Sequence, residues 1–418
     1  MVSTPVHARS GPRVFIVVEN LAPRRDRRVW REAQALRDAG YVPCLIGPTA
    51  PGDGWRSEVE GIELRTYPRP PALSGVSGFV VEYAYSFAAI ATMLAVAGRE
   101  RRPSAVQICN PPDIFFPIAA VCRRFGIPVV FDHHDLAPEL FVTRFGNRLG
   151  LVRRFLELCE RETFRRSDHV IATNESYREI ARTRGGKPDD AVTVVRNGPD
   201  ITHMTPVPPR PELKCGRAHL CVWFGNMGPQ DGVDRALRAA SWLVHTAGRD
   251  DVHFAFVGTG DALPAMRELA SALGLDAHVT FTGWVDDATA FAYLSTADIG
   301  LSADPPGPLN SVSTMNKTME YMAFGLPVVA FDLVETRRSA GEAALYAEED
   351  DPVEYAQAIE KLLDDAGLRA ELGRIGRRRV ETQLAWQHQR AAYVGVYDRV
   401  VGRAGIESFE SSRGLADG

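Results

Sequence analysis

The sequence of 418 residues predicts an α/β protein built from two doubly wound domains. Short β-branched apolar runs alternate with longer amphipathic stretches, and this alternation occurs on both sides of a proline-rich segment. With 45% hydrophobic and 24% charged residues, the chain is long enough to bury two cores.

In the first half, the apolar runs are short and nearly continuous, as is typical of strands buried on both faces of a parallel sheet. They cover residues 14–20, 42–47, 105–110, 128–134, 169–174 and 192–197. Between the first two runs, Val29, Ala33 and Leu36 recur at helical spacing before Gly40 ends the pattern. We therefore expect a Rossmann-like domain over residues 1–200.

The domain boundary is predicted from proline content. Residues 199–216 contain five prolines and no hydrophobic periodicity, which predicts a linker over residues 201–216. The strand and helix pattern then restarts and predicts a second doubly wound domain over residues 217–384. Residues 385–404 have a helical pattern that we expect to return to the first domain, and the polar residues 405–418 predict disorder.

One long apolar stretch, residues 76–98, is interrupted by Glu82 and by several small or polar residues. A membrane-spanning helix needs about 20 predominantly apolar residues. The stretch therefore predicts a helix within the core or on the surface. We favour the core, with contact to a membrane surface as the alternative, because both environments accept an apolar face.

Charge and cysteine content exclude several classes of protein. The net charge of −5 argues against a nucleic-acid-binding protein, which needs a basic surface. The first 200 residues are net positive and the remainder net negative, so only the first domain suits an anionic surface. The six cysteines form no CxxC pair, and the polar N-terminus does not resemble a signal peptide. We expect a cytoplasmic protein, with peripheral attachment to the inner face of the membrane as the alternative.

The segment 310–332 carries the strongest chemical signal, because ligands of open parallel sheets bind at the carboxyl ends of strands. Ser313 or Thr314 is placed to cap a short helix whose N-terminus attracts phosphate, and Lys317 adds a positive charge in its first turn. Glu320 lies on the same face and can accept hydrogen bonds from vicinal ribose hydroxyls. Spacing alone favours an ordinary exposed ion pair of Lys317 and Glu320.

The stretch EYMAFGLPVVAFD, residues 320–332, resembles the signature of glycosyltransferase family 4, retaining enzymes of the GT-B fold that use nucleotide-activated sugars. FDHHDLAPELF, FGNMGPQDGVDRAL and FTGWV occur in the order typical of the family. The resemblance covers residues 12–400 and is strongest to the bacterial branch that builds surface polysaccharides and related glycoconjugates. It implies two Rossmann-like domains facing across a cleft, with the C-terminal helix crossing back to the first domain.

This resemblance also implies site residues. Glu320 matches the glutamate that holds the donor ribose, Val285 the position whose backbone contacts the base, and His134 the histidine beside the donor sugar. Asn226 falls where many relatives place an arginine on the diphosphate. The implied donor-binding residues are Asn226, Val285, Thr314, Lys317 and Glu320, and the implied catalytic residues are His134 and Lys317.

Several residues of the family pattern are replaced. Val312 stands in place of the first of two glutamates, and Asn226 and Asp231 stand in place of an arginine and a lysine. NLAPRRDRRVW replaces a glycine-rich loop after the first strand, and its basic run is most simply a solvated helix start. Lys317 is therefore expected to take over the diphosphate. The remaining candidates for contact with the acceptor or a phosphate are Asn20, Arg27 and Arg28.

A retaining transfer implies front-side displacement, in which the leaving diphosphate oxygen accepts the acceptor proton and the protein supplies position and charge. We favour a UDP-sugar donor and a hydroxyl acceptor on a small molecule or a lipid-linked sugar. No metal or other cofactor is expected, because the residues of the Asp132–Asp135 cluster alternate sides of a strand end. A purely structural histidine remains an alternative for both His133 and His134.

Two other functions remain open. A sugar-nucleotide epimerase of the same architecture needs paired carboxylates around the sugar, which we do not recognise in the second domain. A catalytically silent subunit that binds sugar nucleotides is suggested by Val312 and by the missing cations.

Overall fold

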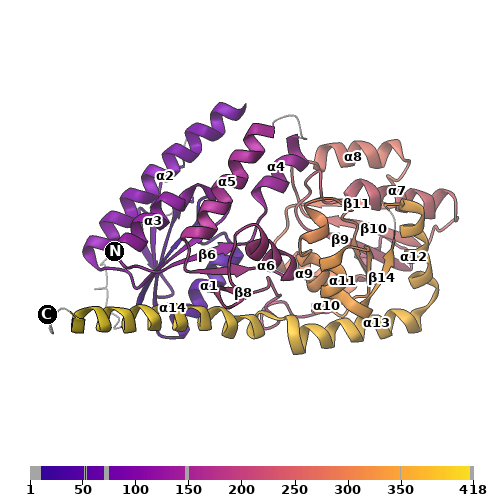
Figure 1. Ribbon diagram of the computed structural model, residues 1–418. Helices are drawn as coiled ribbons and strands as arrows, with labels where there is room; N and C mark the ends of the chain where they lie inside the picture. The colour runs from indigo at the N-terminus through magenta and orange to yellow at the C-terminus, as the bar shows by residue number, and fades with distance from the viewer. Residues whose placement is uncertain are drawn as a thin grey trace. The chain divides into compact units, whose positions relative to one another are not determined.

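The computed structural model describes residues 11–414 apart from 51, 53, 70–74, 146–149 and 349. The chain divides into two compact units (Figure 1). The first consists of Met1–Val195 together with Arg390–Gly418, and the second of Arg196–Gln389. Both are α/β units with a parallel sheet, so the predicted fold class is confirmed.

The first unit has an eight-stranded sheet in the order β3-β4-β2-β1-β5-β6-β7-β8, in which only β3 runs antiparallel to its neighbour. All six strands predicted here are present. The sequence did not predict β3 and β4. The strands are β1 Arg13–Val17, β2 Val42–Pro48, β3 Arg56–Val59, β4 Ile62–Tyr67, β5 Ala105–Cys109, β6 Val129–His133, β7 His169–Ala172 and β8 Val192–Val194.

Helices link most of the parallel strands of the first unit, and one further helix lies at the C-terminus of the chain. They are α1 Arg27–Asp38, α2 Gly75–Glu100, α3 Phe116–Arg124, α4 Ala137–Phe145, α5 Gly150–Arg166, α6 Glu175–Thr183 and the C-terminal α14 Trp386–Gly414. Asp26 caps α1 by accepting hydrogen bonds from the backbone N–H groups of Arg28 and Val29.

The second unit has a six-stranded parallel sheet in the order β11-β10-β9-β12-β13-β14. Its strands are β9 His219–Phe224, β10 Val252–Val257, β11 Val279–Gly283, β12 Ile299–Ser302, β13 Val328–Phe331 and β14 Ala344–Ala347. Its helices are α7 Val233–His245, α8 Leu263–Ala272, α9 Asp287–Thr296, α10 Asn316–Ala323, α11 Val334–Ala340, α12 Pro352–Asp364 and α13 Ala366–Arg379. The sequence did not predict β14.

The proline-rich segment belongs to the second unit. The backbone N–H groups of Val207 and Arg210 donate to the side-chain oxygens of Ser295 and Thr296, at 2.9 and 2.8 Å. The residues expected to form a linker are therefore bonded to α9, because a chain without its own sheet partners uses side chains to satisfy its backbone groups.

The C-terminal helix packs on the first unit. Tyr393 and Tyr397 of α14 are fully buried, and both hydroxyls donate to Oε1 of Gln107 on β5. Residues 405–414, expected to be disordered, continue this helix, and residues 415–418 lie outside the described part of the chain.

The strand order reverses once in each sheet, between β1 and β5 in the first unit and between β9 and β12 in the second. Such switch points are where open α/β sheets bind ligands, beyond the carboxyl ends of the strands. A ligand site is therefore expected among the segments that follow these four strands.

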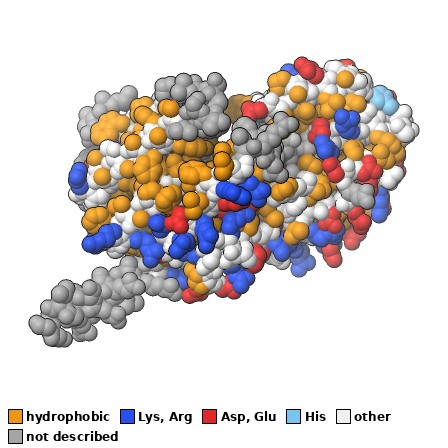
Figure 2. Space-filling model, turned by 45° about the horizontal axis from the view of Figure 1, so that its top comes forward, with side chains coloured by type: hydrophobic (Ala, Val, Ile, Leu, Met, Phe, Trp, Pro, Cys, Tyr) orange, Lys and Arg blue, Asp and Glu red, His pale blue; other side chains and the backbone are white. Residues whose placement is uncertain are grey.

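α2 covers much of the apolar stretch of the sequence and lies largely on the surface. Its segment Val81–Glu100 is long and apolar enough to cross a membrane, and only a small share of it is buried. Ser86, Ile90 and Ala97 face the core, whereas Val81 and Val96 are exposed. The prediction that this helix packs in the core is thus correct only for the face that carries Ser86, Ile90 and Ala97. Figure 2 shows hydrophobic side chains gathered over the first unit.

Candidate functional site

The switch point of the second sheet is held together by α10. Tyr321 of α10 is fully buried, accepts a hydrogen bond from Phe224 N at 2.8 Å and donates to Leu301 O at 3.0 Å. It thereby ties the end of β9 to the end of β12. A Cβ on Gly300 would lie 2.4 Å from Tyr321 Cγ, so only glycine lets α10 approach β12 this closely.

Lys317 lies at this switch point and is 8% exposed. Its Nζ donates to Asp304 Oδ1 at 2.6 Å and lies 4.7 Å from the centre of the Trp223 ring. Asp304, two residues after the end of β12, is itself buried, and its other carboxylate oxygen accepts from Ser302 Oγ at 2.9 Å. The interpretation of Lys317 as an ordinary exposed residue is wrong, because a buried ammonium group requires a partner of this kind.

The start of α10 differs from the prediction. Met315, in extended conformation, is the residue that precedes the helix, and it makes no side-chain capping hydrogen bond. Ser313 Oγ instead donates to Leu309 O at 2.8 Å, and Thr314 lies half-buried one residue before Met315. The helix therefore begins one to two residues later than a Ser313 or Thr314 cap would place it. The backbone oxygen of Met315 accepts from Thr318 N at 3.1 Å in the first turn.

Three other predicted donor residues lie along the carboxyl edge of the same sheet. Asn226 follows β9 and is exposed, whereas Val285, two residues after β11, and Glu320, one turn into α10, are half-buried. Asp231, which replaces a family lysine, accepts a hydrogen bond from Gly228 N at 2.7 Å. It closes the loop after β9, so a structural role accounts for a carboxylate at this position.

The predicted residues of the first unit gather at the carboxyl edge of its own sheet. Arg28 is 9% exposed, and its guanidinium donates to both carboxylate oxygens of Asp132, at 3.0 and 2.7 Å. Arg28 Nε also lies 3.0 Å from Glu32 Oε1. The prediction that this basic run is a solvated helix start therefore fits Arg27, which is exposed, and is wrong for Arg28, which is buried. Asn20, after β1, is exposed.

His134 completes this charged cluster. Its Nδ1 lies 3.1 Å from Asp132 Oδ2, and its backbone N–H donates to Asn110 Oδ1 at 2.8 Å. Burial disfavours the imidazolium, but the Asp132 carboxylate outweighs it and raises the pKa of His134 to about 9. Burial likewise opposes ionisation of Asp132, yet Arg28 and His134 hold the pKa of Asp132 below its ordinary value. Two cations thus face one carboxylate at neutral pH.

His133 points to the other side of the strand end. It is fully buried, its Nε2 lies 3.2 Å from Glu160 Oε1, and it packs against the rings of Phe164 and Tyr177. The structural interpretation therefore fits His133, whereas His134 lies at the sheet edge with Asp132. The alternation expected for this strand end is present.

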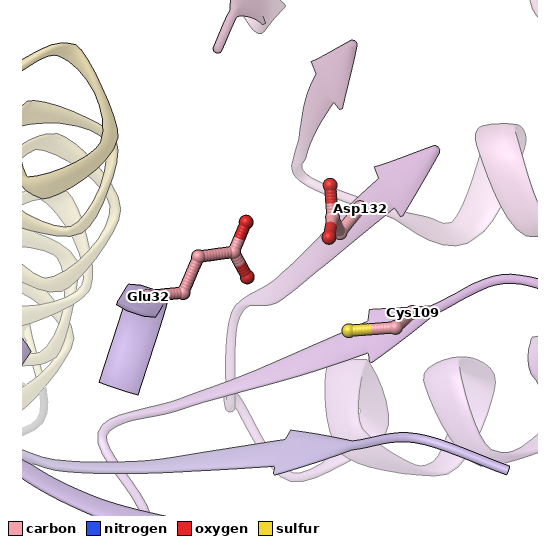
Figure 3. Close-up of side chains that lie close together, drawn as sticks. All are labelled: Glu32, Cys109 and Asp132. Atoms are coloured by element: carbon pink, nitrogen blue, oxygen red, sulfur yellow. The ribbon is translucent and has the colours of Figure 1, made fainter. Parts of the chain in front are cut away.

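Figure 3 shows Glu32 of α1 pointing toward Asp132 at the end of β6 and Cys109 at the end of β5. Ligand atoms of these three residues lie within 4.8 Å of one another, close enough to hold a metal ion. Their chemistry fits a metal poorly. Burial raises the pKa of the Cys109 thiol well above its ordinary value and that of Glu32 to about 8, so both groups retain their protons. Arg28 already neutralises Asp132.

Sequence inspection missed Asp304, Trp223 and the Asp132–Arg28 pair. Asp304 lies two residues after the end of β12, and a carboxylate so close to a strand end is a usable signal for an edge residue. Arg28 and Glu32 are four residues apart on a helix whose other inward positions are apolar, which points to an inward-facing charged pair. Their partners come from other strands, and no local pattern specifies those.

Comparison with known proteins agrees with this architecture. The family model of the glycosyl transferase 4-like domain matches residues 26–198, and that of glycosyl transferases group 1 matches residues 218–365. The lipopolysaccharide core biosynthesis glycosyltransferase LpsD of Rhizobium meliloti is 28% identical over 230 residues, which are 53% of this chain and 61% of that protein. The alpha-D-kanosaminyltransferase of Streptomyces kanamyceticus is 24% identical over 358 residues, 79% of this chain and 87% of that protein. The chain thus spans less than two thirds of the length of LpsD.

Solved structures show the same fold. Sucrose-phosphate synthase from Thermosynechococcus elongatus superposes with a TM-score of 0.73 at 16% identity, over 94% of this chain and 100% of that chain. Anabaena Alr3699/HepE in complex with UDP-glucose gives a TM-score of 0.66 at 16% identity, over 96% and 100%.

Two doubly wound units of this kind form the GT-B fold, and the two family models identify the chain as a glycosyltransferase. The two domain models follow each other along most of the chain in the order of the two units. The chain belongs to the family that they describe, the glycosyltransferases of the family 4 type.

Proposed function

We propose that the protein transfers a sugar from a UDP-sugar to a hydroxyl acceptor with retention of configuration. The buried Lys317 at the switch point of the second sheet carries this proposal. Its ammonium group has three N–H donors, and the bond to Asp304 uses one of them. The other two remain as hydrogen-bond donors for a diphosphate at the N-terminus of α10, whose helix dipole attracts an anion. The structure of HepE with UDP-glucose supports the choice of uridine.

Within this proposal, Glu320 accepts hydrogen bonds from the donor ribose, and the backbone of Val285 contacts the base. Thr314 and Asn226 flank the diphosphate. In a front-side displacement, Lys317 stabilises the charge that develops on the leaving diphosphate as the acceptor oxygen attacks the anomeric carbon. The leaving oxygen takes the acceptor proton, so no separate base and no metal ion are required.

His134 of the first unit is the second catalytic residue of this proposal. The imidazolium is held in place by Asp132, which is itself fixed by Arg28. In this proposal, Asn20 and Arg27, both exposed at the same sheet edge, contact the acceptor or a phosphate.

The acceptor that we propose is lipid-linked, with the first unit resting on an anionic membrane surface. Exposed Leu151, Phe155 and Leu158 lie on one face of α5. Arg154 and Arg161 are exposed on the same helix. An apolar stripe with flanking arginines is typical of segments that lie in the interface of anionic bilayers.

Sedimentation with vesicles tests the membrane contact. We expect wild-type protein to sediment with vesicles containing phosphatidylglycerol and a variant with Leu151→Ser and Phe155→Ser to remain in the supernatant. Exposed Val353→Ser on α12 is the matched control. If the wild-type protein does not sediment with anionic vesicles, a soluble small-molecule acceptor becomes the better proposal.

Incubation of the purified protein with labelled UDP-sugars tests the activity itself. Transfer to an acceptor, or slow hydrolysis in its absence, supports the proposed reaction, and an α-linked product supports retention from an α-linked donor. Formation of an epimeric sugar nucleotide supports the epimerase. Binding of UDP without turnover supports the silent subunit.

A further inference from the structure

A basic depression lies on the second unit, away from the proposed donor site. It has a volume of about 460 Å³ and is formed by Arg374, Arg378 and Arg379 at the end of α13, by Thr382 in the following helical turn, and by Gly341. Pockets of about 300–1,000 Å³ hold small molecules in other proteins. The depression is therefore large enough for a ligand of the size of a monosaccharide phosphate.

Its position separates it from the donor site. Gly341 begins the turn η6, Gly341–Ala343, which directly precedes β14, and β14 runs parallel to β13. Gly341 thus lies at the amino edge of the sheet. The residues proposed for the donor, Asn226, Val285 and Lys317, follow or flank the carboxyl ends of the strands. A ligand in the depression has no need to compete with the donor.

Two arginines of the depression differ from the basic residues around them. Arg377 pairs with Glu381, Arg337 with Asp332 and Arg338 with Glu335. Arg374 and Arg378 are exposed, and among the residues that the structure describes neither guanidinium has a hydrogen bond or ion pair. Like charges four residues apart on a helix repel each other. An anion between them removes that repulsion.

Arg379 adds a third guanidinium that is already held in place. Its Nε donates to Ser339 O at 2.8 Å and its Nη2 to Arg338 O at 2.7 Å, which leaves three of its five N–H donors. A Cβ on Gly341 would lie 3.7 Å from the guanidinium carbon, so the wall of the depression stands directly against this group. Only Glu342, also in the lining, opposes the three positive charges.

We propose that this depression is a second ligand site of the protein and binds a phosphorylated sugar. Planar guanidinium groups bind phosphate oxygens through paired, charge-assisted hydrogen bonds, which suits Arg374 and Arg378 to the phosphate. Thr382 and Gln383 present a hydroxyl and an amide to a polyhydroxylated body. The helix dipole favours basic residues in the last turn of α13, but it does not account for Arg374 one turn earlier.

Isothermal titration of the full chain tests the site, with glucose 6-phosphate as the probe and glucose as the uncharged comparison. We expect glucose 6-phosphate to bind and glucose not to bind, and Arg374→Gln with Arg378→Gln to weaken the binding at least about tenfold. Arg238→Gln, an exposed arginine of α7, is the matched control and should bind as wild type. UDP affinity should be equal in all three proteins, which shows that both variants fold.

Three results would overturn the proposal. The first is a wild type that binds no glucose 6-phosphate, and the second is equal binding by the double variant. The third is displacement of glucose 6-phosphate by UDP, which would place the probe in the donor site. Vesicles containing phosphatidic acid distinguish the source of the phosphate. Sedimentation that depends on Arg374 and Arg378, without binding of the soluble probe, would assign the site to a lipid headgroup and refute the sugar phosphate.

Discussion

Replacement of Lys317 by alanine is expected to destabilise the second unit before it reveals anything about catalysis. Lys317 is 8% exposed and Asp304 1%, and their charged atoms are 2.6 Å apart. Removing one member of a buried pair leaves an uncompensated charge and costs about 3–5 kcal/mol. The lost contact with the Trp223 ring adds up to about 2 kcal/mol. We therefore expect a loss of at least about 3 kcal/mol in the free energy of unfolding.

A second substitution separates this structural loss from chemistry. In Lys317→Met with Asp304→Asn, no buried charge remains, and the asparagine oxygen still accepts the bond from Ser302. Urea unfolding should show most of the stability restored, whereas turnover of a UDP-sugar should stay low because the leaving diphosphate lacks its cation. A Lys317→Ala variant that loses less than about 1 kcal/mol, or a double variant as unstable as the single one, would refute the buried-pair argument.

Three further predictions concern pH and packing. The positive charge on His134 should contribute at most about 3 kcal/mol to the free energy of unfolding below pH 6.5, and this contribution should disappear as the pH rises through 9. In His134→Gln the free energy of unfolding should no longer fall over this range. Denaturation at a series of pH values measures both proteins. Burial raises the pKa of Glu19 to about 7, so the wild type should lose at most about 3 kcal/mol between pH 4.5 and 7, and Glu19→Gln should be the more stable protein at pH 8. An unchanged slope in either variant would contradict the corresponding assignment. Gly300→Ala should lower the free energy of unfolding by about 2–3 kcal/mol because the new Cβ forces Tyr321 to move. Gly402→Ala, with open space around the new Cβ, is the control and should not lower it. Equal melting temperatures of the two variants would exclude the clash at Gly300.

Strands with a strong apolar pattern were predictable from the sequence, and the weaker ones were not. Five of the six predicted strands of the first unit are buried along their length or nearly so, which produces the continuous apolar runs that were recognised, and β8 is partly buried. By contrast, β3 has the sequence RSEV, lies at the sheet edge and is partly exposed, so it has no apolar signal. β14 is apolar, with the sequence ALYA, but its four residues are too few to show a period of their own.

The same limit applies to the site. Strand ends and a helix start can be located from the chain, and they placed Lys317, Glu320 and His134 at sheet edges. Whether a charged side chain forms an ion pair depends on residues that belong to other helices and strands. Asp304 neutralises Lys317 from 13 residues away, and Asp132 binds Arg28 from 104 residues away. Neither pairing has a local sequence signature.

Titration of UDP into wild type and Glu320→Ala tests the donor site most directly. Loss of the hydrogen bonds that the ribose hydroxyls donate to the Glu320 carboxylate should weaken UDP at least about tenfold, and the free base uracil, which lacks ribose, should show no difference between the two proteins. This result would support the donor site at the start of α10. Equal affinity of wild type and Glu320→Ala for UDP, or no binding of UDP to the wild type, would contradict it.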